Sequence, residues 1–189
     1  MNARRIRSAA EIGLTIALAA VLHLVAVWQM PQGGSYSLAM LPLFVLALMR
    51  GVGPGMTAGA LYGLLDLAMK PYIYHPVQVV LDYPLAYALV GLAGLLSVRW
   101  RRLHAADRPT AGVWTAVVPG IIVGALGRYA AHVASGVIFF SSYALELGEA
   151  PLWYSLVYNS FVLLSAVACA FAVVAVLPPL QSAFGVRER

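Results

Sequence analysis

The most polar stretch of this chain lies near its middle and reads Tyr72-Ile73-Tyr74-His75-Pro76-Val77-Gln78-Val79-Val80-Leu81-Asp82-Tyr83-Pro84. An apolar run from Leu85 to Val98 follows it, which places Asp82 one or two turns inside a membrane-spanning helix. An ionisable side chain costs about 2.5–3.5 kcal/mol at the centre of a bilayer, so it usually marks a functional site. Asp82 is therefore the first candidate site residue; the alternative is an acid that stays hydrated at the helix mouth without a role.

Composition predicts an all-α integral membrane protein. The 189 residues are 62% hydrophobic and 10% charged, whereas soluble domains carry roughly 25% charged residues. This length accommodates one membrane bundle, so we expect a single domain over residues 1–189. The net charge of +5 does not indicate nucleic-acid binding, because the arginines lie in short segments between apolar runs. The single cysteine, Cys169, excludes a disulfide framework.

Six apolar runs approach the length that a bilayer requires, about 17–25 residues for a helix. An even number of spans places both termini on the same side. We expect turns or loops at residues 31–37 and 141–150, and spans at residues 12–30, 38–49, 56–68, 76–98, 114–140 and 152–177.

Charge distribution predicts the orientation of these spans. Lys70 is alone on one side, Arg128 lies inside the fifth span, and ten arginines lie on the side of the termini. Because positive residues accumulate in cytoplasmic segments, both termini are predicted to be cytoplasmic. The ten are Arg4, Arg5, Arg7, Arg50, Arg99, Arg101, Arg102, Arg108, Arg187 and Arg189.

Polar residues of three predicted spans then share the outer half of the bilayer. Unpaired polar groups that face lipid each cost several kcal/mol, so we expect these side chains to meet in one pocket that opens to the exterior. They are Asp82, Tyr83, Arg128, His132, Tyr154 and Asn159.

Spacing in the fifth span supports this pocket. Arg128, His132, Gly136 and Phe140 follow one another at intervals of four, and each step drifts about 40° around a helix, so the first three share a face. Two potential cations side by side need an acid or a ligand between them. Asp82 can supply that acid, and a purely structural Asp82–Arg128 ion pair without a ligand is the alternative.

A carboxylate surrounded by aromatic rings suits a flat organic cation, since each cation–π contact contributes about 0.5–2 kcal/mol.

The sequence gives little support to an enzyme, because it has neither zinc-ligand spacing nor a phosphate-binding P-loop. Asp66 and Lys70 stand four residues apart, and we interpret them as a local pair on a helix surface.

The pattern resembles the thiamine-binding S-component of energy-coupling factor (ECF) vitamin transporters. The fourth-span segment is the most specific part of this resemblance. The segments that carry it are Gly33-Gly34-Ser35, Leu41-Pro42, Arg50-Gly51 with Gly55 and Gly59, His75-Pro76-Val77-Gln78, Asp82-Tyr83-Pro84-Leu85-Ala86, Arg128-Tyr129 with His132 and Gly136, and Tyr154-Ser155-Leu156 with Asn159.

The resemblance implies six helices, cytoplasmic termini and an outward-facing thiamine site in a prokaryotic plasma membrane. It also implies a transmembrane coupling protein and two cytoplasmic ATPases as partners, so that ATP is hydrolysed by them and this chain has no cofactor. Phe140 stands where family members carry a tryptophan, and Tyr36 is the candidate aromatic lid. The implied thiamine-binding residues are Tyr36, Tyr72, Asp82, Tyr83, Arg128, His132, Gly136, Phe140, Tyr154 and Asn159.

Three alternatives stay open on the sequence. The chain could be an S-component for another vitamin or a thiamine-related compound. It could be a small membrane enzyme in which Asp82 and His132 act as acid and base. It could also be a structural bundle that binds nothing.

Overall fold

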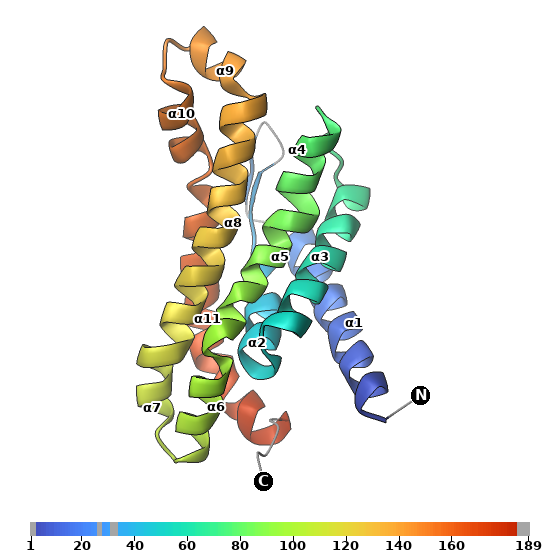
Figure 1. The fold of residues 1–189 in the computed structure, drawn as a ribbon, viewed down its shortest axis with the longest axis vertical. Coiled ribbons are helices and arrows are strands. Elements are labelled where there is room, and N and C mark those ends of the chain that lie inside the picture. The colour runs from blue at the N-terminus through green and yellow to red at the C-terminus, as the bar shows by residue number, and fades with distance from the viewer. Residues whose placement is uncertain (1–2, 26–27, 31–33, 185–189) are drawn as a thin grey trace.

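The structure, a computed structural model, describes residues 3–25, 28–30 and 34–184 as an elongated bundle of helices (Figure 1). Two short strands accompany the helices within this described part. The helices are α1 (Ala3–Leu24), α2 (Met40–Arg50), α3 (Val52–Met69), α4 (Pro76–Val80), α5 (Ala86–Val90), α6 (Ser97–Ala105), α7 (Pro109–Gly112), α8 (Val118–Phe139), α9 (Ser141–Glu146), α10 (Pro151–Tyr158) and α11 (Phe161–Phe184).

Irregular helical turns join several of these helices into longer rods. A π-helical turn, Leu81–Leu85, links α4 to α5, and a 3₁₀ turn, Gly91–Leu96, links α5 to α6. A second π-helical turn, Val113–Val117, links α7 to α8. Among the described residues, four helical segments are long and apolar enough to cross a membrane: Arg5–Leu24, Pro76–Ala105, Pro109–Phe139 and Pro151–Phe184. The predicted all-α membrane fold is confirmed at this level, and the count of six spans stays a prediction.

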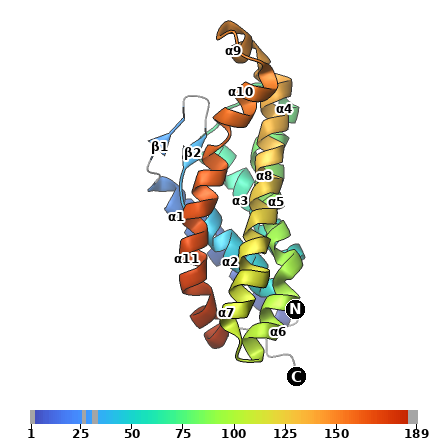
Figure 2. The same cartoon turned by 90° about the vertical axis from the view of Figure 1, so that its left-hand side faces the viewer.

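The first connection differs from the sequence prediction. Helix α1 ends at Leu24 rather than near Met30, and the chain then forms strand β1 (Trp28–Gln29) and strand β2 (Ser35–Tyr36). The two strands pair antiparallel, with Trp28 opposite Tyr36, and strand β2 lies beside α11 (Figure 2). Backbone pairing in the hairpin replaces the helical hydrogen bonds that the apolar sequence alone favours. Residues 31–33 of the predicted loop lie outside the described residues.

The last two predicted elements also differ in detail. The predicted loop at 141–150 contains helix α9, and the predicted sixth span is interrupted. The interruption falls between α10 and α11, at Asn159 and Ser160.

Helix α2 forms the centre of the packed core. Eight of its eleven residues are buried, because α1, α3, α6, α8 and α11 all contact it. A helix that is apolar all round is stable only when neighbours surround it. The core therefore surrounds α2, which lies in the lower half of the bundle in Figure 1.

A charged cluster ties three helices together at the end where α1 begins and α11 ends. Glu11 accepts hydrogen bonds from Arg50 Nε and one terminal nitrogen, both at 2.7 Å, and from Arg7 Nε at 2.9 Å. Arg50 and Arg7 also donate to the carbonyl oxygen of Phe184, at 2.9 and 3.1 Å. These contacts place the described ends of the chain side by side.

Helix α3 approaches the fourth predicted span very closely. A Cβ atom on Gly63 would meet the carbonyl group of Tyr83 and lie 2.8 Å from Cα of Pro84. Glycine is therefore required at this crossing, as in other membrane helix pairs that bring their backbones together.

We predict that Gly63→Ala destabilises the protein by roughly 1–3 kcal/mol, since overpacked sites cost this much. The detergent-solubilised variant should melt several degrees below the wild type, at about 2–4 °C per kcal/mol for a chain of this size. Gly53→Ala, at the start of the same helix, is the matched control because nothing lies within 4 Å of its added methyl group. Equal melting temperatures for both variants would contradict the close packing at Gly63.

Candidate functional site

Asp82 lies on the π-helical turn that follows α4. His75 caps α4 by accepting a hydrogen bond from the backbone N–H of Val77 at 3.1 Å, and Pro76 occupies the first helical position, where a missing N–H costs nothing. Pro84 lies inside the turn and removes one backbone donor. Such π-helical turns occur frequently at functional sites.

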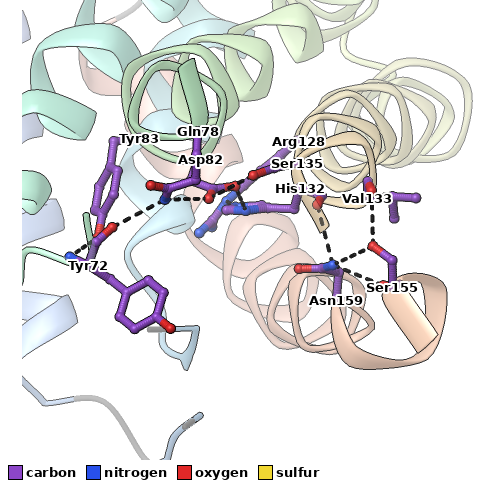
Figure 3. Close-up of polar contacts among 10 residues, drawn as sticks. All are labelled: Tyr72, Gln78, Asp82, Tyr83, Arg128, His132, Val133, Ser135, Ser155 and Asn159. Carbon is purple, nitrogen blue, oxygen red and sulfur yellow. Dashed lines mark hydrogen bonds and ion pairs between the residues drawn. The ribbon is translucent and has the colours of Figure 1, made fainter. Parts of the chain in front are cut away.

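The Asp82 carboxylate joins α4 to α8 (Figure 3). One oxygen accepts from the Gln78 amide at 2.7 Å and from the Ser135 hydroxyl at 2.9 Å. The other oxygen lies 3.1 Å from Nδ1 of His132, which donates to it. The Asp82 and His132 side chains keep 16% and 11% of their surfaces exposed, so a ligand can still reach both.

Arg128 contacts Tyr87 and His132 in the structure, whereas the alternative prediction paired it with Asp82. Its guanidinium carbon lies 4.0 Å from the centre of the Tyr87 ring, and its Nε donates to Nε2 of His132 at 3.4 Å. Among the described residues, no ion pair joins Arg128 to Asp82. Nε2 accepts from Arg128 and Nδ1 donates to Asp82, so His132 is a neutral imidazole. Its ring lies between the Asp82 carboxylate and the Arg128 guanidinium.

The end of α10 closes the other side of the site. Nδ2 of Asn159 donates to the backbone carbonyl of Ser155 at 2.9 Å and to that of His132 at 3.4 Å. The Ser155 hydroxyl donates to the carbonyl of Val133 at 2.9 Å. Ser155 also fills the space that a Cβ on Gly136 would occupy, so Gly136 serves close packing between α8 and α10.

Aromatic side chains gather at the mouth of the site. Phe140 contacts the rings of Tyr72, Tyr74 and Tyr143, with centroids 5.5–6.2 Å apart. A hydrogen bond with the Tyr143 hydroxyl, together with partial burial, raises the pKa of Tyr72 to about 12. Tyr72 is therefore an uncharged phenol at neutral pH.

Tyr83 holds the segment between α3 and α4 in place. Its hydroxyl accepts from the backbone N–H of Tyr72 at 2.8 Å and donates to the carbonyl of Lys70 at 3.1 Å. Both hydrogen bonds of the Tyr83 hydroxyl are thus to backbone groups, and the one to the Tyr72 N–H positions the Tyr72 ring.

These groups surround one cavity, which leaves about 70 Å³ for the centres of water-sized molecules. Nine of the ten predicted site residues line it, from Tyr72 to Asn159. The tenth, Tyr36, packs edge-on against Phe161 at 6.1 Å instead, and Phe161 itself lines the cavity.

Several lining residues escaped the sequence analysis. The prediction of a surface Asp66–Lys70 pair is wrong: Asp66 is buried and lies 3.0 Å from Nδ1 of His23 on α1. Both residues line the cavity. Gln78 and Ser135, the direct partners of Asp82, were also missed as site residues. Ser135 follows His132 by three positions, a spacing that places both on one helix face and could have identified it.

The fold and the cavity define a helical membrane protein with a buried polar binding site. Residues 9–184 match the family model described as thiamine transporter protein (Thia_YuaJ). The chain therefore belongs to this family of thiamine transporters.

Relatives and a solved structure agree with this assignment. The chain is 38% identical over 169 residues to thiamine transporter ThiT of Bacillus subtilis strain 168, covering 84% of this chain and 86% of the relative. It is 33% identical over 143 residues to ThiT of Lacticaseibacillus paracasei, covering 73% and 70%. A solved structure of ThiT from Listeria monocytogenes superposes with a TM-score of 0.87 at 28% identity, covering 97% of this chain and all of that one.

The role of the Tyr83 hydroxyl can be measured at the Tyr72 amide. In Tyr83→Phe we expect hydrogen exchange at this amide to accelerate by about 2- to 10-fold, because one hydrogen bond contributes roughly 0.5–1.5 kcal/mol. Tyr74→Phe, which removes the hydroxyl of an exposed neighbour, should leave the exchange rate unchanged. Equal protection in both variants would show that Tyr83 does not hold this segment.

Proposed function

We propose that this protein is the thiamine-binding S-component of an ECF-type importer in a prokaryotic plasma membrane. The observation that carries the proposal is the Asp82–His132 contact inside an aromatic-lined cavity of a chain that belongs to the thiamine transporter family. Thiamine combines a positively charged thiazolium ring with a flat aminopyrimidine ring, and the cavity offers a partner for each feature.

Each cavity group then has a distinct task. Asp82 balances the thiazolium charge or accepts a hydrogen bond from the aminopyrimidine. His132 and Phe140 stack on the rings. Asn159 orients the ligand, since its side-chain oxygen accepts no hydrogen bond from the described residues and is free to accept one from the vitamin. Tyr154, which lines the same wall, orients the ligand with it.

The orientation of the protein follows from its charges. The ends of α1, α2 and α6 that carry arginines lie together, and the cavity lies in the other half, near α4 and α10 (Figure 1). The positive-inside rule assigns the arginine-rich end to the cytoplasm. The cavity then receives thiamine from the exterior, within the outer leaflet.

In this proposal, other subunits of the importer supply the energy for import. A transmembrane coupling protein and two cytoplasmic ATPases would associate with the chain, and they would hydrolyse ATP. The chain itself captures the vitamin and catalyses no reaction.

Titration of the detergent-solubilised protein with thiamine, followed by calorimetry, tests the proposal directly. We expect saturable binding of one thiamine per chain. Binding of a different vitamin in place of thiamine would indicate an S-component of other specificity. Turnover of a lipid without ATPases would indicate an enzyme, and the absence of any binding would leave a structural bundle.

Asp82→Asn should weaken thiamine binding at least tenfold, about 1.4 kcal/mol, because it removes the charge that contacts His132 and faces the cavity. Glu149→Gln is the matched control, since it removes a carboxylate that is exposed in the connection between α9 and α10. The control should bind like the wild type. An unchanged affinity in folded Asp82→Asn would refute the assignment of Asp82.

A further inference from the structure

The mouth segment, residues 70–75, connects α3 to α4 beside the aromatic mouth of the cavity. Tyr72 lines the cavity, and the Tyr74 ring packs against Phe140 with centroids 5.5 Å apart. Ile73 and Tyr74 are 68% and 62% exposed, so apolar burial contributes little to the position of this segment. Its position therefore depends on the hydrogen bonds that its backbone makes with the rest of the protein.

Gln78, on α4, supplies two of these hydrogen bonds. Its Oε1 accepts from the backbone N–H of Tyr74 at 3.0 Å, and its Nε2 donates to the carbonyl oxygen of Tyr72 at 3.2 Å. The same nitrogen donates to Oδ2 of Asp82 at 2.7 Å. A side-chain amide has two N–H donors, so the Tyr72 carbonyl and the Asp82 carboxylate use both of them.

The partners of Gln78 fix the orientation of its amide. A backbone N–H only donates and a backbone carbonyl only accepts, so the amide oxygen must face Tyr74 and the amide nitrogen must face Tyr72. The side chain is 1% exposed. An ionised glutamate would keep the acceptor for Tyr74 but would lose both donors. Position 78 therefore needs an amide to hold the mouth segment and Asp82 at the same time.

Ser135, on α8, has a different set of contacts. Its hydroxyl donates to the same oxygen of Asp82 at 2.9 Å, and the residue is buried like Gln78. Among the described residues, no hydrogen bond joins Ser135 to the mouth segment. Gln78 and Ser135 thus share Asp82 as a partner, and of the two only Gln78 extends the contact to the mouth segment.

We propose that Gln78 is a positioning residue that fixes Asp82 and the mouth segment relative to each other, so that the acid and the Tyr72 ring reach the ligand together. The inference rests on the proposed function, in which the ligand is thiamine. Coupling between two sites is reciprocal. A ligand that contacts Asp82 and Tyr72 therefore also stabilises the mouth segment through Gln78.

The first test measures thiamine affinity in Gln78→Met, which keeps the length of the side chain and removes its hydrogen bonds. We expect a loss of about 3- to 10-fold, as for one hydrogen bond. In a Tyr72→Ala background, the same substitution should change the affinity by less than about twofold. There, Ser135 and His132 still hold Asp82, while the ring that Gln78 positions is absent.

Ser135→Ala is the matched control. It removes a donor from the same oxygen of Asp82 without a contact to the mouth segment. Its effect on thiamine affinity should therefore be the same with and without the Tyr72 ring, as expected for independent sites. If Gln78→Met leaves the affinity unchanged, or lowers it by the same factor in both backgrounds, the inference is overturned.

Hydrogen exchange at the Tyr74 amide gives a second test, which can be made on the wild type even if Gln78→Met does not fold. Saturating thiamine should slow this exchange by about 2- to 10-fold in the wild type and in Ser135→Ala. It should not slow the exchange in Gln78→Met, where the amide has lost its acceptor. A rate that thiamine leaves unchanged in the wild type would overturn the inference. Failure of the wild type to bind thiamine would instead overturn the proposed function.

Discussion

The carboxylate of Asp82 connects the polar segment at residues 72–84 to helix α8. It accepts hydrogen bonds from Gln78 on its own helix and from Ser135 and His132 on α8. Both oxygens are thereby satisfied in an apolar environment, where an unpaired charge would be strongly unfavourable. This contact holds α4 and α8 together beside the cavity. Arg128, Tyr87 and Asn159 complete the walls around it.

One half of the molecule is packed around α2, and the other half surrounds the cavity. Around α2, the packed residues are mainly apolar, and Glu11 and Arg50 tie α1, α2 and α11 together at the end of that half. Around the cavity, polar and aromatic side chains replace this packing. A rigid apolar half can hold the polar groups of the other half at fixed positions, which is what a binding site requires.

Sequence reasoning could predict those features that depend on local pattern. The four-residue spacing of Arg128, His132 and Gly136 identified the face of α8, and the polar groups of three helices line one cavity as expected. Features that depend on distant partners could not be predicted. Asp66 contacts His23, which is 43 positions away along the chain, so its spacing to Lys70 was misleading. The hairpin and the break at Asn159 arise from tertiary packing that overrides apolar content.

The π-helical turn at Leu81–Leu85 has a geometric consequence for the wall of the cavity. In a regular α-helix, residues five positions apart point about 140° away from each other. Asp82 and Tyr87 are five positions apart, yet both face the same cavity. One additional residue in that turn shifts the phase of the helix and aligns them. Replacing the π-helical turn by a regular α-helical turn of the same residues would therefore place the acid and the ring that carries Arg128 about 140° apart, even though every side chain is kept.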